Sequence, residues 1–221
     1  MTRSSYCLVV MSKAPIAGRV KTRLIPVLGA RRAAGIYRCL LVETLEAISP
    51  LRQIDIRLSC APDIYHASFL RAARQYGYRR QQQPTGDLGR RMSVTIAALL
   101  RHYAGVILIG ADCPAMNATL IEQCRSYLEQ GADLVLGSTD DGGYALIGMR
   151  RANPALFRGM PWGTARVAGI TRQRAKRLGL RCEEVSGLWD VDTMADYRRW
   201  QRYRRVYGKD WGKSQGKAWV V

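Results

Sequence analysis

The sequence predicts a single α/β domain, a three-layer α/β/α arrangement with a mostly parallel sheet. Three observations lead to this class. Short apolar runs alternate along the chain with longer segments of helical periodicity, as in parallel strands joined by helices. The 221 residues make up about one and a half times a usual domain of roughly 150 residues. Hydrophobic residues form 48% of the chain, which is enough for a core and excludes a disordered protein.

The first third of the chain predicts strand, helix and strand. Tyr6–Met11 is apolar on both faces, as a central parallel strand is, and leads into the loop SKAPIAGRVKTR. Ala30–Ile48 has apolar residues at helical spacing and is followed by Ser49-Pro50, so we expect a helix that ends there. Ile54–Cys60 then indicates a second strand.

The middle of the chain repeats this alternation. Asp63–Gly77 predicts a helix that Gly77 ends, and Tyr78–Gln83 predicts a short polar strand. The loop QPTGDLG opens another helix, whose apolar body is Ser93–His102. Val106–Ile109 is the strongest strand signal in the chain and runs into Gly-Ala-Asp-Cys-Pro.

The last third predicts a hairpin and three helices. Asn117–Gln130 reads as a helix with Asn117 as its N-cap, followed by two strands on either side of STDDGG that form a hairpin or a bent edge. The remaining predicted elements are the strands Asp133–Gly137 and Tyr144–Gly148, the basic helix Thr164–Leu178, the strand Cys182–Val185 and the helix Thr193–Val206. We expect one domain over residues 1–206 and a basic, aromatic tail over residues 207–221.

Charge and composition narrow the classes of function. Thirty-five Lys and Arg against 17 Asp and Glu give a net charge of +18, which favours anionic partners such as nucleotides, nucleic acid, phosphorylated metabolites or a membrane surface. No apolar run has the length of a membrane span, and the N-terminus lacks a signal-peptide pattern, so a cytoplasmic protein is expected. The six cysteines show no metal-ligand spacing, and His66 and His102 lie in predicted helices, which argues against a histidine-activated nucleophile.

The loop after the first strand is a candidate anion site. It carries Lys13, Gly18, Arg19, Lys21 and Arg23 where ligands bind in open α/β sheets, beyond the carboxyl ends of strands. Glycine allows close approach of the backbone, and exposed amides and cations bind phosphate. The loop matches neither GxxxxGK[ST] nor GxGxxG. A phosphate cradle and a solvated basic loop both fit these residues.

Two acidic residues are candidate metal ligands. Asp112 directly follows the apolar strand Val106–Ile109, a position from which a carboxylate can share Mg²⁺ or Mn²⁺ with nucleotide phosphates. The alternative is a turn or N-cap aspartate before Pro114. Asp190 and Asp192 in WDVDT precede the last helix, and the alternative to a metal ligand is that Asp192-Thr193 forms an N-terminal cap.

An acidic turn is a candidate acceptor site. Asp140, Asp141, Gly142, Gly143 and Tyr144 lie between two predicted strands, and a carboxylate there can orient or deprotonate an acceptor hydroxyl. Aspartate followed by glycine is also what a tight turn requires.

Six segments in one order resemble a known family. KAPIAGRVKTRL, QPTGDLGRRM, GADCP, DDGGYALIG, PWGTARV and DVDT are similar to the bacterial radical-SAM/selenodomain-associated transferases, over about residues 6–200. That family has the glycosyltransferase-A fold of the nucleotide-diphospho-sugar transferases, a Rossmann-like sheet. Its N-terminal loop is similar to those of nucleotidylyltransferases. The resemblance therefore implies a nucleoside triphosphate or a nucleotide sugar as substrate.

The resemblance also implies roles for residues. Arg19, Lys21 and Arg23 match the loop that holds the di- or triphosphate, and Asp112 and Asp192 match the metal ligands. The segment GDLG-x-RM, expected near the nucleotide, supplies Gly86, Asp87, Gly89 and Arg91. Trp162 and Thr164 are expected on the acceptor side together with the acidic turn, where Asp141 is a candidate base. Two departures are a single acid in DCP, where glycosyltransferases have two, and Met-Ala-Asp after DVDT in place of Pro-Glu-Asp.

Three functions remain open on the sequence. A metal-dependent nucleotidylyl transfer to a small phosphorylated or hydroxylated acceptor fits the first loop best, because it needs cations on departing pyrophosphate and little covalent chemistry. Glycosyl transfer from a nucleotide-diphospho-sugar is the second hypothesis. A nucleic-acid-binding protein is the third, because cations alternate with Trp200, Tyr203, Tyr207, Trp211 and Trp219 near the C-terminus. The same tail is expected to bind polyanions or an anionic membrane surface weakly.

Overall fold

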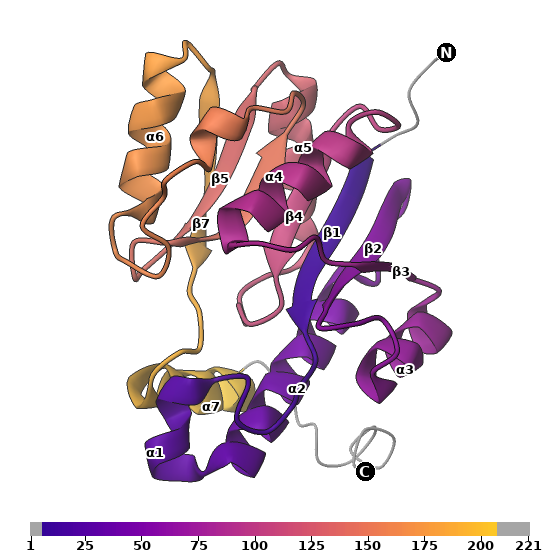
Figure 1. Cartoon of the computed structure of the whole chain (residues 1–221), viewed down its shortest axis with the longest axis vertical. Helices are drawn as coiled ribbons and strands as arrows, with labels where there is room; N and C mark the ends of the chain where they lie inside the picture. The colour runs from indigo at the N-terminus through magenta and orange to yellow at the C-terminus, as the bar shows by residue number, and fades with distance from the viewer. Residues whose placement is uncertain (1–5, 207–221) are drawn as a thin grey trace. The chain divides into compact units, whose positions relative to one another are not determined.

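The computed structural model describes residues 6–206, whose secondary structure alternates between strands and helices (Figure 1). The strands are β1 (Tyr6–Lys13), β2 (Ile54–Ala61), β3 (Arg79–Gln82), β4 (Val106–Gly110), β5 (Leu134–Thr139), β6 (Tyr144–Met149) and β7 (Cys182–Leu188). The α-helices are α1 (Ile25–Leu28), α2 (Ala30–Ile48), α3 (Ala67–Tyr76), α4 (Leu88–Leu99), α5 (Ala118–Glu129), α6 (Val167–Arg177) and α7 (Met194–Val206). Two 3-10 helices, Thr22–Leu24 and Pro154–Leu156, add one turn each.

The seven strands form one sheet in the order β3-β2-β1-β4-β6-β5-β7. β1 pairs in parallel with β2 and β4, β2 with β3, and β5 with β7. β6 runs antiparallel to its neighbours β4 and β5, so the predicted β5–β6 hairpin is confirmed. Six strands therefore end at the same edge of the sheet, which we call the carboxyl edge.

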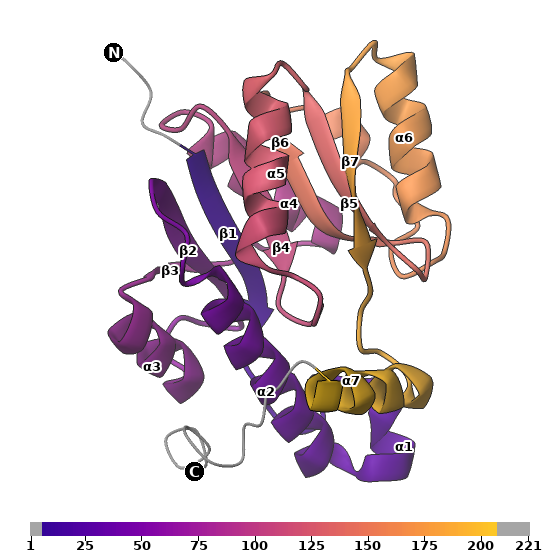
Figure 2. The same ribbon diagram turned by 180° about the vertical axis from the view of Figure 1, so that it is seen from behind.

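The sheet has a packed core on each face because side chains alternate along the strands. Cys7, Val9, Val106 and Leu108 pack with Met92 and Ile96 of α4 and with Ala175 of α6, in a cluster that forms the core of one face. Gly148 lies on the other face, where a side chain would collide with Cys124 and Leu128 of α5. Figures 1 and 2 show α4 and α5 on opposite sides of the sheet. The predicted three-layer α/β/α architecture is confirmed.

The described residues divide into two compact units. The first comprises the chain up to Ala14 together with Leu40–Asp190, and it contains all seven strands. The second comprises Pro15–Cys39 and the described residues from Val191 on, and it contains α1, the first half of α2 and α7. The predicted boundary between a domain and a tail falls where the described residues end, so residues 207–221 lie outside them.

Several element ends differ from the predicted ones, and both histidines lie outside helices. α3 begins at Ala67 because His66 is its N-cap, with Nδ1 accepting from the amide of Ser68 at 3.2 Å. α4 ends at Leu99, which leaves His102 in the following turn. β1 continues to Lys13 because β2 pairs with it over its whole length. No helix among residues 6–206 is long and apolar enough to cross a membrane.

Candidate functional site

The carboxyl edge of the first unit brings together three of the predicted segments. Met11 of β1 pairs with Gly110 of β4, so the chain reaches Lys13 and Asp112 two residues beyond this pair. The β4–β6 pairing, with Ile109 opposite Leu146, brings the acidic turn before Tyr144 to the same edge. Lys13 is exposed and Asp112 is half-buried. Ligands of open α/β sheets bind at this edge.

The carboxylate of Asp112 lies close above its own strand end. A side chain at Gly110 would come within 3.0 Å of Oδ1 of Asp112, so the absence of one gives the carboxylate its room. A second carboxylate, Asp190, follows β7 at the same edge. Burial, together with the charges of Asp190 and Asp112, raises the pKa of the Cys113 thiol to about 12, so both carboxylates lie near this thiol.

The donor set at Asp112 fits a hard divalent cation that keeps other ligands. Among residues 6–206 no group of three or more His, Cys, Asp or Glu side chains could enclose a metal ion. Mg²⁺ is commonly held by one or two carboxylates and completed by waters and substrate phosphates. The carboxylate oxygens of Asp112 are of the ligand type that such a site uses.

The segment after β3 is anchored by a buried glutamine, Gln83, which is not among the predicted site residues. Gln83 is 8% exposed, and its Nε2 donates to the carbonyls of Ser12 at 2.9 Å and Ser59 at 2.8 Å, so it ties together the ends of β1 and β2. Arg91 donates to Oε1 of Gln83 at 3.4 Å and to the carbonyl of Gly86 at 2.8 Å. In the sequence Gln83 is the last of three consecutive glutamines in a polar segment, so no local pattern distinguishes it from its neighbours.

The GDLG part of this segment has clear backbone reasons for its residues. Asp87 is the N-cap of α4, with Oδ1 accepting from the amide of Arg90 at 2.7 Å. Gly86 has a φ of 112°, a conformation that favours glycine. At Gly89 a side chain would lie 2.8 Å from the ring of Trp162 and 2.9 Å from the carbonyl of Phe157. The structure therefore places GDLG directly against PWGT.

The predicted acceptor residues also lie together. The rings of Tyr144 and Trp162 meet edge to face, with centroids 6.2 Å apart, and burial raises the pKa of the Tyr144 hydroxyl. The amide of Ala168 donates to the carbonyl of Gly142 at 3.0 Å, and a side chain at Gly142 would collide with Ala165. The acidic turn is thus packed on the segment that follows Trp162.

Within the acidic turn, Asp141 has a turn role of its own. Its Oδ1 accepts from the hydroxyl of Thr139 at 2.6 Å and from the amide of Gly143 at 3.0 Å. Asp140 and Asp141 are both exposed, and Thr164 is exposed with its hydroxyl donating to the carbonyl of Pro161 at 2.8 Å. The turn geometry accounts for one oxygen of Asp141 and leaves the role of the other as a prediction.

The second unit contains the predicted phosphate loop and its own acidic residue. Nζ of Lys21 lies 3.0 Å from Oδ1 of Asp192 and 5.9 Å from the centre of the Tyr37 ring. Arg23 reaches Oδ2 of Asp192 at 3.3 Å with a side chain that is 62% exposed. Arg19 and Gly18 are exposed, and Gly18 has a φ of 84°. The chain therefore brings Lys21, Arg23 and Asp192 together, and leaves Arg19 outside this group.

The N-cap of α7 is formed by residues other than Asp192. The hydroxyl of Thr193 accepts from the amide of Asp196 at 3.3 Å, while the Asp196 carboxylate accepts from the amide of Thr193 at 2.7 Å. This is a reciprocal capping box. The cap expected at Asp192-Thr193 is confirmed for Thr193 and is wrong for Asp192, because the carboxylate of Asp192 pairs with Lys21 and Arg23.

A family model and a solved structure are similar to this chain. A family model described as "Uncharacterized protein conserved in bacteria (DUF2064)" matches residues 44–164. A candidate nucleotide-diphospho-sugar transferase from Desulfovibrio desulfuricans G20 is similar at 30% identity and a TM-score of 0.81, over 98% of this chain and 94% of that one. No curated protein sequence matches.

Two solved structures of low identity share the fold. The 4-diphosphocytidyl-2C-methyl-D-erythritol synthase of Anaerococcus prevotii DSM 20548 has a TM-score of 0.63 at 13% identity, over 91% of this chain and 96% of that one. The glucosyl-3-phosphoglycerate synthase of Mycobacterium tuberculosis, in complex with Mn²⁺ and UDP, has a TM-score of 0.51 at 14% identity. The match covers 84% of this chain and 70% of that one. The predicted glycosyltransferase-A-like fold is confirmed.

Proposed function

This chain belongs to the DUF2064 family, and we propose that it is a metal- and nucleotide-dependent transferase. The observation that carries the proposal is the position of Asp112 beyond β4, at the same sheet edge as Lys13 and the acidic turn. The similarity to the Desulfovibrio protein supports it, because that protein is a candidate nucleotide-diphospho-sugar transferase. The radical-SAM association stays a prediction.

We infer nucleotidylyl transfer as the reaction. An acceptor oxygen forms a bond to the α-phosphorus of a nucleoside triphosphate while the bond to the bridging oxygen breaks and pyrophosphate leaves. A divalent cation at Asp112, Mg²⁺ or Mn²⁺, would neutralise charge on phosphate oxygens. Lys21 and Arg23 are the proposed phosphate-binding side chains of the second unit, and Asp192 stays a predicted metal ligand.

The acceptor side is assigned to the first unit. The oxygen of Asp141 that the turn does not use is the proposed base, which takes the proton of the acceptor hydroxyl. Tyr144, which directly follows this turn, meets the ring of Trp162 edge to face, and both side chains pack against the hydrophobic core. Arg91, held by Gln83 and Gly86, is a proposed contact of the nucleotide.

Glycosyl transfer is the second candidate, favoured by the similarity to the Desulfovibrio protein. In that reaction the acceptor oxygen bonds to the anomeric carbon and a nucleoside diphosphate leaves. The two reactions use the same phosphate-binding and metal-binding groups and differ in the bond that breaks.

Slow transfer to water separates the two reactions without knowledge of the acceptor. The protein is incubated with Mg²⁺ and either nucleoside triphosphates or nucleotide sugars, and the products are identified by mass spectrometry. Release of nucleoside monophosphate and pyrophosphate supports nucleotidylyl transfer, and release of nucleoside diphosphate and free sugar supports glycosyl transfer. Asp112→Asn is expected to abolish either release, whereas the control Glu122→Gln on α5 keeps it. If the native protein releases no more product than the Asp112→Asn protein, the proposal is contradicted.

A further inference from the structure

The second unit concentrates positive charge beyond what the proposed reaction needs. Its described residues, 15–39 and 191–206, hold eleven Lys and Arg against two Asp. The cations are Arg19, Lys21, Arg23, Arg31, Arg32, Arg38, Arg198, Arg199, Arg202, Arg204 and Arg205. Such a density on one small unit attracts anionic surfaces.

Both acids of this unit are used internally. Asp192 accepts from Lys21 and Arg23, and Asp196 accepts from Thr193 in the capping box of α7. The ion pairs made by residues 6–206 do not include Arg198, Arg202 or Arg205. These arginines therefore present their charge to the surroundings.

The exposed arginines of α7 form a stripe. Arg198, Arg202 and Arg205 are exposed and follow one another at spacings of four and three residues, which places them on one helix face. The buried side of the helix carries the aromatic residues, with Tyr197 9% exposed and Trp200 2% exposed. The guanidinium of Arg204 lies 4.9 Å from the centre of the Trp200 ring. Trp200 is thus covered and cannot stack on a nucleobase.

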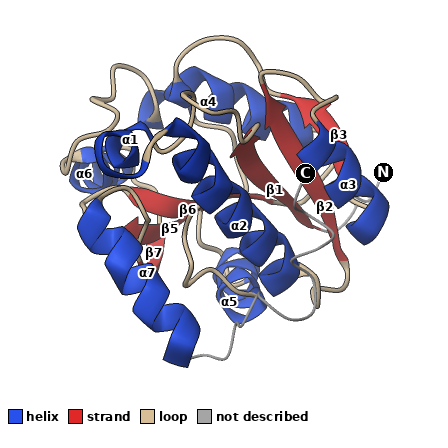
Figure 3. Ribbon diagram, turned by 90° about the horizontal axis from the view of Figure 1, so that it is seen from below, coloured by secondary structure: helices blue, strands red, loops and turns tan. Residues whose placement is uncertain are grey.

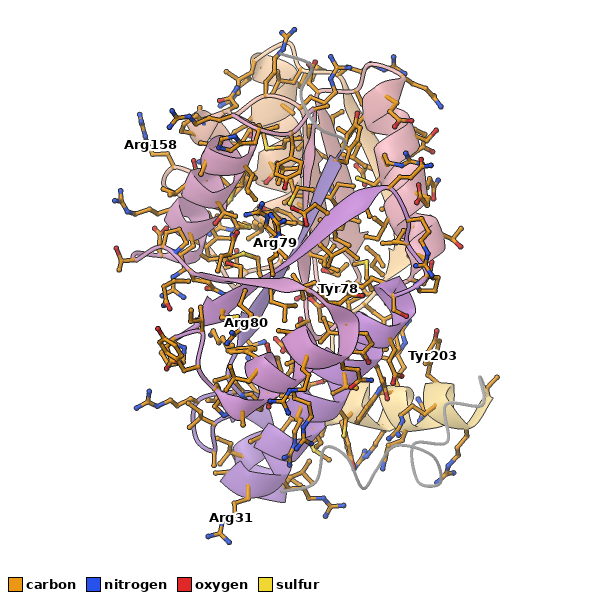
Figure 4. All side chains as sticks on the ribbon, turned by 90° about the vertical axis from the view of Figure 1, so that its right-hand side faces the viewer. Arg31, Tyr78, Arg79, Arg80, Arg158 and Tyr203 are labelled. Atoms are coloured by element: carbon orange, nitrogen blue, oxygen red, sulfur yellow. The ribbon has the colours of Figure 1, made fainter. Side chains whose placement is uncertain are left out.

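A second part of the unit combines cations with an exposed apolar side chain. Val27 in α1 is 66% exposed, and Arg31 and Arg32, in the first turn of α2, are exposed. In Figure 4 the Arg31 side chain extends away from the ribbon. Figure 3 shows the ribbons of α1, α2 and α7. We call the stripe of Arg198, Arg202 and Arg205 on α7 the basic face.

We propose that the basic face docks on the surface of a membrane that contains anionic lipids. The three arginines interact with the headgroups through charge. Single-stranded nucleic acid fits less well, because its binding relies on exposed aromatic rings, and the aromatic rings of Tyr197 and Trp200 are buried. The docking is independent of the proposed reaction, which is assigned to other residues.

Vesicle sedimentation with the full-length protein tests the proposal. Vesicles of phosphatidylcholine with phosphatidylglycerol are expected to pellet the protein, pure phosphatidylcholine is not, and added salt weakens the binding. Replacing Arg198, Arg202 and Arg205 by Gln is expected to lower the partition coefficient on the order of a hundredfold, since each cation near such a surface contributes about fivefold.

The matched control removes the same charge elsewhere. Arg101, Arg151 and Arg177 are exposed residues of the first unit, and their replacement by Gln leaves the basic face intact. Equal loss in both triple variants overturns the proposal, because net charge alone then explains binding. The proposal is also overturned if the native protein binds duplex DNA or RNA but not vesicles, and the α7 triple variant loses that nucleic-acid binding. The nucleotide-induced rise in melting temperature is measured in both variants, and we expect it to be unchanged.

Discussion

Nζ of Lys21 lies 3.0 Å from Oδ1 of Asp192, although 171 residues separate them along the chain. The lysine side chain is 3% exposed and the aspartate side chain 43% exposed, so the pair joins a buried cation to an anion at the surface. The backbone of Lys21 has a φ of 48°, in the left-handed region. A buried cation held in this conformation indicates that the contact fixes the loop in place.

Asp192→Asn is expected to lower the free energy of unfolding by about 1–2 kcal/mol, because Lys21 keeps its buried charge and loses a carboxylate. The value is below that for a fully buried pair because solvent screens the half-exposed aspartate. Urea unfolding measures the change. Glu129→Gln is the control, since it breaks an exposed pair with Arg125 on one helix and is expected to change stability by less than about 0.5 kcal/mol. Equal effects of the two substitutions would remove the structural role of the Lys21 contact.

Gly89→Ala and Gly169→Ala are expected to change stability in opposite directions. Both glycines lie in helices, but a side chain at Gly89 meets Trp162 and the carbonyl of Phe157, whereas none lies within 4 Å at Gly169. We expect Gly89→Ala to cost about 1–3 kcal/mol through overpacking, and Gly169→Ala to stabilise α6 by up to about 1 kcal/mol. Thermal unfolding checks both signs. A stable Gly89→Ala protein would mean that the GDLG and PWGT segments do not pack tightly.

Asp141→Asn separates the turn role from the acceptor role. Asparagine retains an oxygen that can accept from Thr139 and Gly143, so we expect the melting temperature to stay within about 1 °C of the native value. Turnover is expected to fall by at least about a hundredfold, the lower range for loss of a general base. The measurement is turnover at saturating nucleotide together with nucleotide affinity. Normal turnover would return Asp141 to the turn alone.

The buried thiols predict a loss of stability at alkaline pH. Burial raises the pKa of Cys7 and of Cys60 to about 12, whereas an exposed thiol titrates near 9. Above about pH 9 the unfolded chain loses these protons while the folded chain keeps them, so the free energy of unfolding falls as pH rises towards the folded pKa. We expect about 1.4 kcal/mol per pH unit for each thiol. Urea unfolding between about pH 8 and pH 11 measures this dependence. The free energy of unfolding should fall less steeply with pH for Cys60→Ala than for the native protein, and an equal slope would contradict this.

The sheet could be predicted because apolar runs such as Val106–Ile109 are buried on both faces, and only a central strand needs that pattern. The helix ends were harder to predict, since they depend on single hydrogen bonds. His66 caps α3 through its imidazole, and Thr193 caps α7 together with Asp196, and neither choice follows from periodicity.

The candidate site was predicted in its segments more than in its contacts. The sequence order placed Asp112 and the acidic turn at strand ends, and pairing of β4 with β1 and β6 brings those ends together. Gln83 was not predicted as important, because its three partners come from β1, β2 and α4 and no local pattern connects them. The Lys21–Asp192 contact could not be predicted either, because it joins two distant segments of the chain.

Metal-dependent nucleotide binding at Asp112 tests the central claim most directly. Calorimetric titration of the native protein with nucleoside triphosphates and nucleotide sugars, each with and without Mg²⁺, is compared with the same titrations of Asp112→Asn and of Glu122→Gln. We predict that at least one nucleotide binds the native and Glu122→Gln proteins in a manner that requires Mg²⁺, and that Asp112→Asn loses at least about tenfold in affinity while keeping its melting temperature. Mg²⁺-dependent binding of equal strength in all three proteins, or no binding of any nucleotide to the native protein, would contradict the account.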